Sequence, residues 1–204
     1  YGHGMGSLVT RLCCLHESHW DGVILSGTSS RQKYCRRAIL FTAVMRRFKG
    51  LNHRSRFVEN MIYRRLNRKY RGERDYLSWF SADEDVRERY GADKRSQFQF
   101  TLSAYENIFK MLELVSTKKW YHSIDRELPI LLVSGKDDPI GNFGKGIEEI
   151  YGRLSGEGCC IEMKLYDGIR HELQGDPDRE IIFNDMLNWM KNYAEEPVSM
   201  NGIY

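Results

Sequence analysis

The chain has 204 residues, of which 41% are hydrophobic and 29% charged, and its formal net charge is +3. This composition is ordinary for a globular protein with one large domain or two small ones. The sequence contains no run of 18 apolar residues, which excludes a membrane-spanning helix of the usual kind.

The first predicted elements are a helix and a buried strand. The chain opens on a glycine-rich turn, and a helix from residue 5 to about 18 is predicted by apolar residues at helical spacing: Met5, Leu8, Val9, Leu12 and Leu15. The stretch DGVILSG at 21–27 is continuously apolar between two glycines. Such a run is typical of a strand buried on both faces of a parallel sheet.

Residues 31–125 change in character, because they contain no proline and only helical periodicities. Within them, residues 31–74 carry 15 Lys or Arg against two acids, Glu59 and Glu73. A solvated helix face is one interpretation of this segregation. The other is attraction to an anionic surface, above all phospholipid head groups. Nucleic acid is not expected, since the segment has no recognised binding motif.

Two further strands and two helices are predicted in the last third of the chain. The strands lie in LPILLVSGKDDP (128–139) and CCIEMKLYDG (159–168), and a helix covers 147–154 between them. Asp176-Pro177 should cap a last helix that runs to about Tyr193, and 195–204 should form a loose tail. Helices alternating with buried strands predict the α/β class. Only three strands are visible and none precedes the opening turn, so we expect an upstream part to be missing.

The five cysteines predict free thiols. Their odd number and two adjacent pairs (Cys13, Cys14, Cys35, Cys159 and Cys160) do not suit a disulfide framework. No CxxC or HxxxH spacing offers a metal site. A reducing, cytoplasmic location is therefore predicted.

The opening glycines allow two kinds of site. Gly2, Gly4 and Gly6 give GxGxG, in which the third glycine falls one residue early for dinucleotide binding. Gly2 and Gly6 fit the outer positions of a GxSxG nucleophile elbow, in which a strained central residue exposes its side chain. The central residue here is Gly4 instead of serine.

At this point the chain resembles a known family. GHGMGSLVTRL is similar to the GHSMGS elbow of α/β-hydrolases of the lysophospholipase and monoacylglycerol lipase type, which are grouped with serine aminopeptidase S33-like hydrolases. DGVILSG resembles the strand after the elbow helix, and residues 75–115 resemble the helical lid of bacterial members. LPILLVSGKDDPIGNFGKGI (128–147) and KLYDGIRHELQGD (164–176) resemble the segments that carry the triad acid and histidine.

The resemblance implies the fold and its division. It implies an α/β-hydrolase fold, with a mostly parallel sheet flanked by helices and an inserted helical lid. Core would cover 1–30, lid 31–125 and core again 126–194. It implies no cofactor, and a lipid or other small ester as substrate. The lid could line an acyl pocket with aromatic side chains, or pack them in its own core: Trp79, Phe80, Phe98, Phe100, Tyr105 and Phe109.

The resemblance also implies roles for particular residues. Asp138 would be the triad acid, with Asp137 the less favoured neighbour, and His171 the base. The nucleophile would stand at position 4, where Gly4 has no side chain to form an acyl-enzyme. The Met5 N–H would supply one oxyanion donor.

Neighbouring residues are not expected to replace the missing nucleophile. Ser7 should not do so, since it lies about 4.5 Å along the helix axis. His3 is expected to pack rather than react.

Three origins of Gly4 stay open: a lineage that lost catalysis, an altered nucleophile, or an error in an incomplete sequence. The sequence accordingly predicts a carboxylic ester hydrolase with its nucleophile replaced. The alternative is an inactive pseudo-hydrolase that binds a lipid or a protein, and a third is a basic adaptor at a membrane surface.

Overall fold

A parallel sheet of four strands forms the centre of the molecule. The computed structural model describes residues 1–16, 19–30, 32–96 and 98–193, so the predicted tail at 195–204 lies outside it. The strands are β1 (Gly2–His3), β2 (Val23–Ser26), β3 (Ile130–Gly135) and β4 (Ile161–Tyr166), and they lie side by side in that order. The α/β class and the three predicted strands are confirmed.

The prediction of only three strands is wrong, because Gly2 and His3 pair in parallel with Leu25 and Ser26. A strand of two residues is too short to leave an apolar pattern in the sequence. It nevertheless ends directly before Gly4, and so it positions the glycine-rich turn at the carboxyl edge of the sheet.

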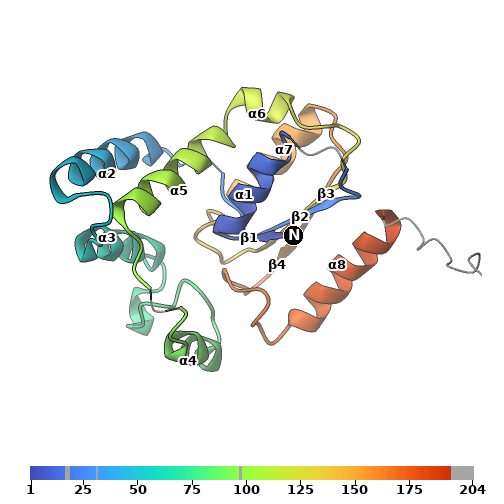
Figure 1. Cartoon of the computed structure of the whole chain (residues 1–204). Coiled ribbons are helices and arrows are strands. Elements are labelled where there is room, and N and C mark those ends of the chain that lie inside the picture. Colours follow the sequence, from blue (N-terminus) through green and yellow to red (C-terminus); the bar gives the residue numbers. More distant parts are fainter. Residues whose placement is uncertain (17–18, 31, 97, 194–204) are drawn as a thin grey trace, which may run out of the picture.

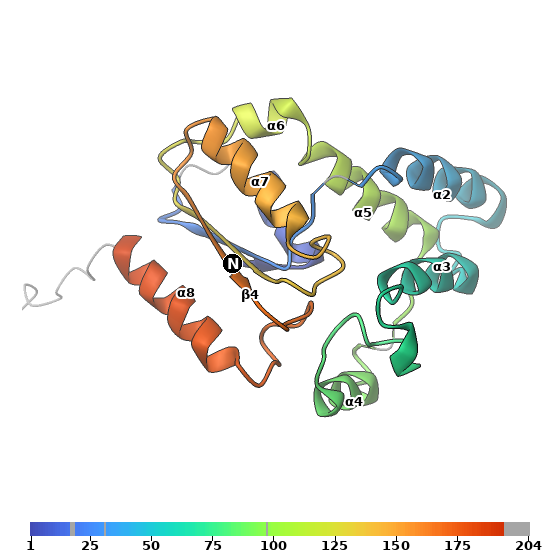
Figure 2. The same cartoon turned by 180° about the vertical axis from the view of Figure 1, so that it is seen from behind.

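Helices cover both faces of the sheet. Helices α1 (Met5–Cys13) and α7 (Lys145–Gly156) pack on one face, and α8 (Arg179–Tyr193) packs on the other (Figures 1 and 2). Leu132 belongs to the apolar cluster that includes residues of α1 and α7, whereas Leu131 and Val133 belong to the cluster with Trp189 of α8. This alternation explains why residues 130–133 of β3 are all apolar, since all six residues of the strand are buried.

Two predicted helix boundaries need correction. The helix predicted over 5–18 ends at Cys13, and residues 17 and 18 lie outside the described residues. The last helix begins at Arg179 rather than beside Pro177. The carboxylate of Asp176 instead accepts the N–H of Asp178 at 3.0 Å. A bond to the residue two places on closes a turn in front of the helix rather than capping it.

The segment between β2 and β3 is helical, as predicted, and we call residues 31–125 the helical insertion. It contains α2 (Cys35–Lys49), α3 (Arg56–Leu66), the short 3₁₀ helix η1 (Arg71–Glu73), α4 (Glu84–Ala92), α5 (Leu102–Leu114) and α6 (Lys118–His122). Four of these helices begin at a side chain that accepts a backbone N–H, as good N-caps do: Ser55, Asp83, Thr101 and Thr117. Figure 1 shows α2, α3 and α4 beyond one end of the sheet, with α5 leading back to it.

A buried arginine joins the insertion to the sheet. Arg11 of α1 is fully buried, and its guanidinium donates to the carbonyl oxygens of Ser29 at 2.9 Å and Val115 at 2.6 Å. Ser29 follows β2 and Val115 follows α5, so one side chain binds both the segment that leads into the insertion and the end of α5. No helix in the described part of the chain has the length and apolar character to cross a membrane.

Candidate active site

Gly4 lies in the turn between β1 and α1 and has a strained backbone. Its φ of 54° and ψ of −119° fall where residues with a Cβ are rare, and its N–H donates to Ser26 O at 3.0 Å. A Cβ built on Gly4 would lie 3.1 Å from His171 Nε2, and among the described residues, apart from the chain neighbours His3 and Met5, only His171 comes within 4 Å of that point. Any side chain at position 4 would therefore be directed at the imidazole.

His171 is held by Asp138. Asp138 follows β3 and is completely buried, and its Oδ2 lies 2.9 Å from His171 Nδ1. Its other oxygen accepts the N–H of Ile140 at 2.8 Å. Burial lowers the pKa of His171, but the charge of Asp138, the hydrogen bond to it and the charge of Glu172 outweigh that effect and raise the pKa above its usual value. This arrangement leaves Nε2 toward Gly4.

Asp137 takes a different position from its neighbour. Its carboxylate pairs with Lys69 at 2.6 Å, and its N–H donates to Ile169 O at 3.0 Å. Tyr70 donates its hydroxyl to the Asp137 carbonyl. Asp137 thus joins the β3 turn to the helical insertion, whereas Asp138 alone of the two contacts the imidazole.

Aromatic rings enclose His171. The rings of His3 and Trp79 have centroids 4.8 and 5.2 Å from that of His171. Burial, together with the neighbouring His171, lowers the pKa of His3 to about 3, so His3 is a neutral ring at physiological pH. Its Nδ1 lies 3.1 Å from Ser26 Oγ. As expected from the sequence, His3 packs against the site.

The residues after Gly4 begin α1. Met5 is the first helical residue, so its N–H belongs to the donors that a helix leaves unpaired at its beginning. Ser7 is completely buried, and its hydroxyl donates to Gly4 O at 2.5 Å. Ser7 therefore contacts the backbone of the turn and does not line the cavity.

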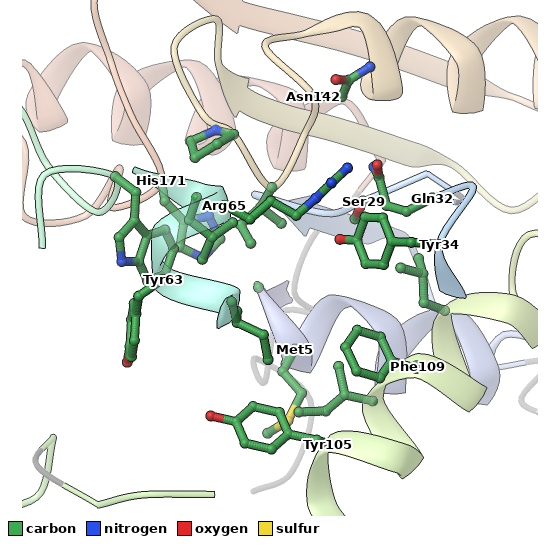
Figure 3. A pocket seen from close by; sticks show the side chains of 18 of the residues that line it. Met5, Ser29, Gln32, Tyr34, Tyr63, Arg65, Tyr105, Phe109, Asn142 and His171 are labelled. Carbon is green, nitrogen blue, oxygen red and sulfur yellow. The ribbon is translucent and has the colours of Figure 1, made fainter. Parts of the chain in front are cut away.

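A cavity of about 620 Å³ opens beside Gly4 and His171 (Figure 3). Most of its lining is apolar or aromatic, and it comes from α1, α3, α5 and the turn after β3. Of the six aromatic residues named from the sequence, Trp79, Phe100, Tyr105 and Phe109 line the cavity. Phe80 is buried within the insertion and Phe98 is exposed.

Sequence reasoning missed the cationic residues of this cavity. It also missed the contact of Arg170 with Glu73 beside the cavity, which we call the latch. Arg65, Arg68 and Lys69 line the cavity, and the available signal was their place in the basic segment at 31–74. Arg170, directly before His171, bonds both carboxylate oxygens of Glu73 at 2.5 and 2.8 Å. Its guanidinium also lies 3.9 Å from the ring of Tyr70. These contacts hold the loop of His171 against the insertion.

The chemistry of the arrangement is that of an oriented base. An imidazole with a buried carboxylate at Nδ1 can accept a proton at Nε2 and return it. A side chain at position 4 would lie beside Nε2, but glycine provides no atom that could exchange a proton with it. Among the residues the structure describes, no three His, Cys, Asp or Glu side chains gather in a group that could hold a metal ion.

Comparisons with known proteins show the family and the fold of the chain. The family model described as serine aminopeptidase, S33 matches residues 1–178. A thermostable carboxyl esterase from Bacillus coagulans, in complex with glycerol, has a TM-score of 0.86 and 23% identity over 94% of this chain and 63% of its own. A lipase in an open form has a TM-score of 0.86 and 20% identity, over 96% of this chain and 64% of its own.

A soluble variant of monoglyceride lipase from Saccharomyces cerevisiae, in complex with a substrate analog, has a TM-score of 0.70 and 18% identity over 96% of this chain and 61% of its own. The chain therefore spans a little over three fifths of the length of these structures. No curated protein matches it in sequence.

Proposed function

Since the chain belongs to the serine aminopeptidase S33 family and has its α/β-hydrolase fold, we propose a carboxylic ester site of the lysophospholipase or monoacylglycerol lipase type. In this proposal Asp138 orients His171, His171 transfers protons, and position 4 is the nucleophile position. The observation that carries it is the 3.1 Å between a Cβ at Gly4 and His171 Nε2. The helical insertion acts as the lid that encloses the ester, and no cofactor is required.

The chemistry with serine at position 4 follows from this geometry. The serine oxygen would attack the acyl carbonyl carbon while its proton passes to His171 Nε2, and the Met5 N–H would bind the developing oxyanion. Collapse would expel the alcohol, which takes the proton from His171. Water would then repeat these steps on the acyl-enzyme and release the acid. Asp138 would stabilise the imidazolium in both halves.

With Gly4 the same site binds an ester without forming an acyl-enzyme. Glycine supplies no oxygen for attack, whereas the dyad of Asp138 and His171 is intact. The apolar cavity supports a ligand with an acyl chain, and the glycerol and substrate analog held by two similar structures favour a small glycerol ester. The protein with glycine is accordingly a binding form of a hydrolase.

The test is to restore the nucleophile in the full-length protein. Gly4→Ser should create esterase activity on short acyl esters and labelling at residue 4 by a fluorophosphonate probe. We expect a gain on the order of 10²-fold over the unmodified protein, because binding and oxyanion donors alone leave a residual rate. Gly4→Ala, which adds a Cβ without an oxygen, is the matched control and should stay unlabelled.

The activity should also disappear when His171→Ala is added to Gly4→Ser. A silent Gly4→Ser protein that is folded and still binds monoacyl esters would contradict the proposed catalytic roles. Binding without turnover would then be the remaining function of the site.

A membrane surface is a second proposed partner, and it rests on the outside of the insertion. Large apolar side chains are exposed on α2, α3 and the loop between them: Leu40, Phe41, Val44, Phe48, Leu51, Phe57 and Met61. We call these residues the α2–α3 patch. Leu40, Val44 and Phe48 recur every four residues and form one stripe on α2, which also carries several arginines. Exposed apolar residues beside cations favour a surface of anionic lipid.

Vesicle binding tests this partner. The full-length protein should co-sediment with vesicles that contain anionic lipid, and binding should weaken as salt rises. Phe48→Glu should reduce the bound fraction, whereas Ile181→Glu on α8, at a similarly exposed apolar position, should not. Equal binding to neutral and anionic vesicles would mean that the cations form only a solvated helix face.

The free state of all five cysteines supports a cytoplasmic location as part of this proposal.

A further inference from the structure

The cavity beside Gly4 has two sides of different chemistry. One side comes from α1 and α5 and is apolar or aromatic: Met5, Leu8, Tyr105, Ile108, Phe109 and Leu112. The other side holds polar and cationic groups. Figure 3 shows Arg65 extending toward Ser29, Gln32 and Tyr34, with Tyr105 and Phe109 below them, around Met5. A ligand that fills the cavity would thus meet both kinds of surface.

The cationic side carries an unbalanced positive charge. Arg65 lies in the last turn of α3, and Arg68 and Lys69 follow in the next turn of the chain. Lys69 is neutralised by Asp137 at 2.6 Å. Among the described residues, no carboxylate lies within ion-pair distance of Arg65 or Arg68, and no Asp or Glu lines the cavity. Two arginines therefore remain available to an anion.

Arg65 is also held in a defined orientation. Its guanidinium carbon lies 4.0 Å from the centre of the Tyr34 ring, so the ring supports one face of the guanidinium. The N–H groups around the edge of a supported guanidinium can form paired hydrogen bonds with two oxygens of a phosphate. A neutral glycerol head group would leave this charge without a partner.

We propose that Arg65 and Arg68 bind the phosphate of a monoacyl glycerophospholipid whose acyl chain lies along α1 and α5. This inference rests on the proposed ester site and narrows its ligand from acyl glycerols in general to those with an anionic head group. The cationic side selects the head group, and the apolar side accepts the chain. The ester then lies between them, beside Gly4 and His171.

Equilibrium binding to the full-length protein with Gly4 tests the inference, since this form has no nucleophile at position 4 to form an acyl-enzyme. Calorimetry would compare a 1-acylglycerol 3-phosphate, with a chain short enough to stay monomeric, to the monoacylglycerol of the same chain and to glycerol 3-phosphate. We expect the phosphate to improve affinity about tenfold over the neutral ester, as charge-assisted hydrogen bonds at a partly solvated site do. Glycerol 3-phosphate alone should bind more weakly than either acylated ligand.

Matched variants locate the effect. Arg65→Gln with Arg68→Gln should lower the affinity for the phosphate ligand to that for the monoacylglycerol and leave the neutral ligand unchanged. Arg64→Gln is the control, because Arg64 is exposed on α3 as Arg65 is, but does not line the cavity. It should leave both affinities as they are.

Several outcomes would overturn the inference. Equal affinities for the two acylated ligands would show that Arg65 and Arg68 do not bind the head group. An equal loss of affinity for the phosphate ligand with Arg64→Gln would show the same. The proposed ester site would stand in both cases. Glycerol 3-phosphate binding as tightly as the acylated phosphate would indicate an anion site unconnected with an acyl chain. Failure of both acylated ligands to bind would overturn the proposed acyl cavity as well.

Discussion

The sheet and the helical insertion bury their side chains against different kinds of neighbour. In the sheet, β3 lies between two strands and between two layers of helix, and its residues are all buried and mostly apolar. In the insertion, α2 leaves Leu40 and Phe48 exposed and depends on ion pairs such as Arg46 with Glu106 at 2.8 Å. The sheet is thus stabilised chiefly by apolar burial, and the insertion also by polar contacts that hold it in place.

The difference shows how the two halves of the candidate site are positioned. Gly4, Asp138 and His171 follow strands of the sheet, so a rigid layer fixes their separation. The cavity wall of α3 and α5 comes from the insertion, which is tied to the sheet by Arg11 and to the His171 loop by Arg170. We therefore expect changes in the sheet to cost more stability than changes in the insertion.

The largest expected effect comes from a pair of glycines, one in each region. A Cβ at Gly135 would overlap the backbone of Ile169, which cannot move without displacing the His171 loop. Gly135→Ala should lower the free energy of unfolding by roughly 3 kcal/mol or more, if the protein folds at all. Gly72→Ala in η1 meets nothing within 4 Å and should change it by less than about 0.5 kcal/mol.

Urea unfolding of both full-length variants measures this difference. Equal midpoints for Gly135→Ala and Gly72→Ala would mean that the end of β3 tolerates as much movement as the insertion. The contrast between the two regions would then be lost.

Arg11 tests the joint between the regions. Arg11→Met would leave the buried carbonyls of Ser29 and Val115 without donors, although it also removes a buried charge. We expect the free energy of unfolding to fall by about 2 kcal/mol. Hydrogen exchange should become faster at the N–H of Ser116, which directly follows Val115 and donates to Glu113 O. Arg95→Met, at an exposed arginine, should do neither. An unchanged exchange rate at Ser116 would show that Arg11 does not hold the insertion.

Much of the sheet could be predicted from the sequence, since β2 and β3 are continuous apolar runs between glycines or turns. The order of Gly4, Asp138 and His171 could be predicted from the resemblance, because each lies in a segment that is similar to a motif of the family. The two-residue β1 could not, as it is defined by pairing with Leu25 rather than by composition.

The arrangement of the insertion was also out of reach. Contacts such as Arg170 with Glu73 join residues 97 positions apart, and both are common surface residue types. No local pattern marks such a pair. The direction in which α3 presents Arg65 depends on the same kind of distant contact.

His3 and His171, which lie side by side at the carboxyl edge of the sheet, should give the free energy of unfolding a maximum near pH 6.5. His3 has a pKa lowered to about 3, so protonation of the unfolded chain removes stability as pH falls below 6.5. His171 has a raised pKa, so its bound proton stabilises the fold below pH 6.5 and this stabilisation is lost as pH rises through its folded pKa. We expect a loss of about 1–2 kcal/mol between pH 6.5 and 5 from His3.

Unfolding measured across this range should separate the two histidines. His3→Asn should flatten the acid side of the maximum and His171→Asn the alkaline side. If both variants altered the same side, the opposite shifts inferred from their surroundings would be wrong.

The smallest effect is expected at the latch between the insertion and the His171 loop. Arg170 lowers the pKa of Glu73 through their hydrogen bonds, so the pair stabilises the contact above about pH 4.5 and loses this effect as pH falls through the folded pKa. Glu73 is partly exposed, so Glu73→Gln should cost less than about 1 kcal/mol in global stability.

The local effect of Glu73→Gln on hydrogen exchange should be clearer. The Glu172 N–H, which donates to Phe80 O at 2.8 Å across the latch, should exchange faster in the variant at neutral pH. The Ile130 N–H, which donates to Cys160 O inside the sheet, is the internal control and should not change. Both proteins should converge in the Glu172 rate once the pH falls below the lowered pKa of Glu73, where Glu73 has lost its charge. Equal acceleration at Ile130 would mean that the latch is part of global unfolding, and the separation between a rigid sheet and a tethered insertion would not hold.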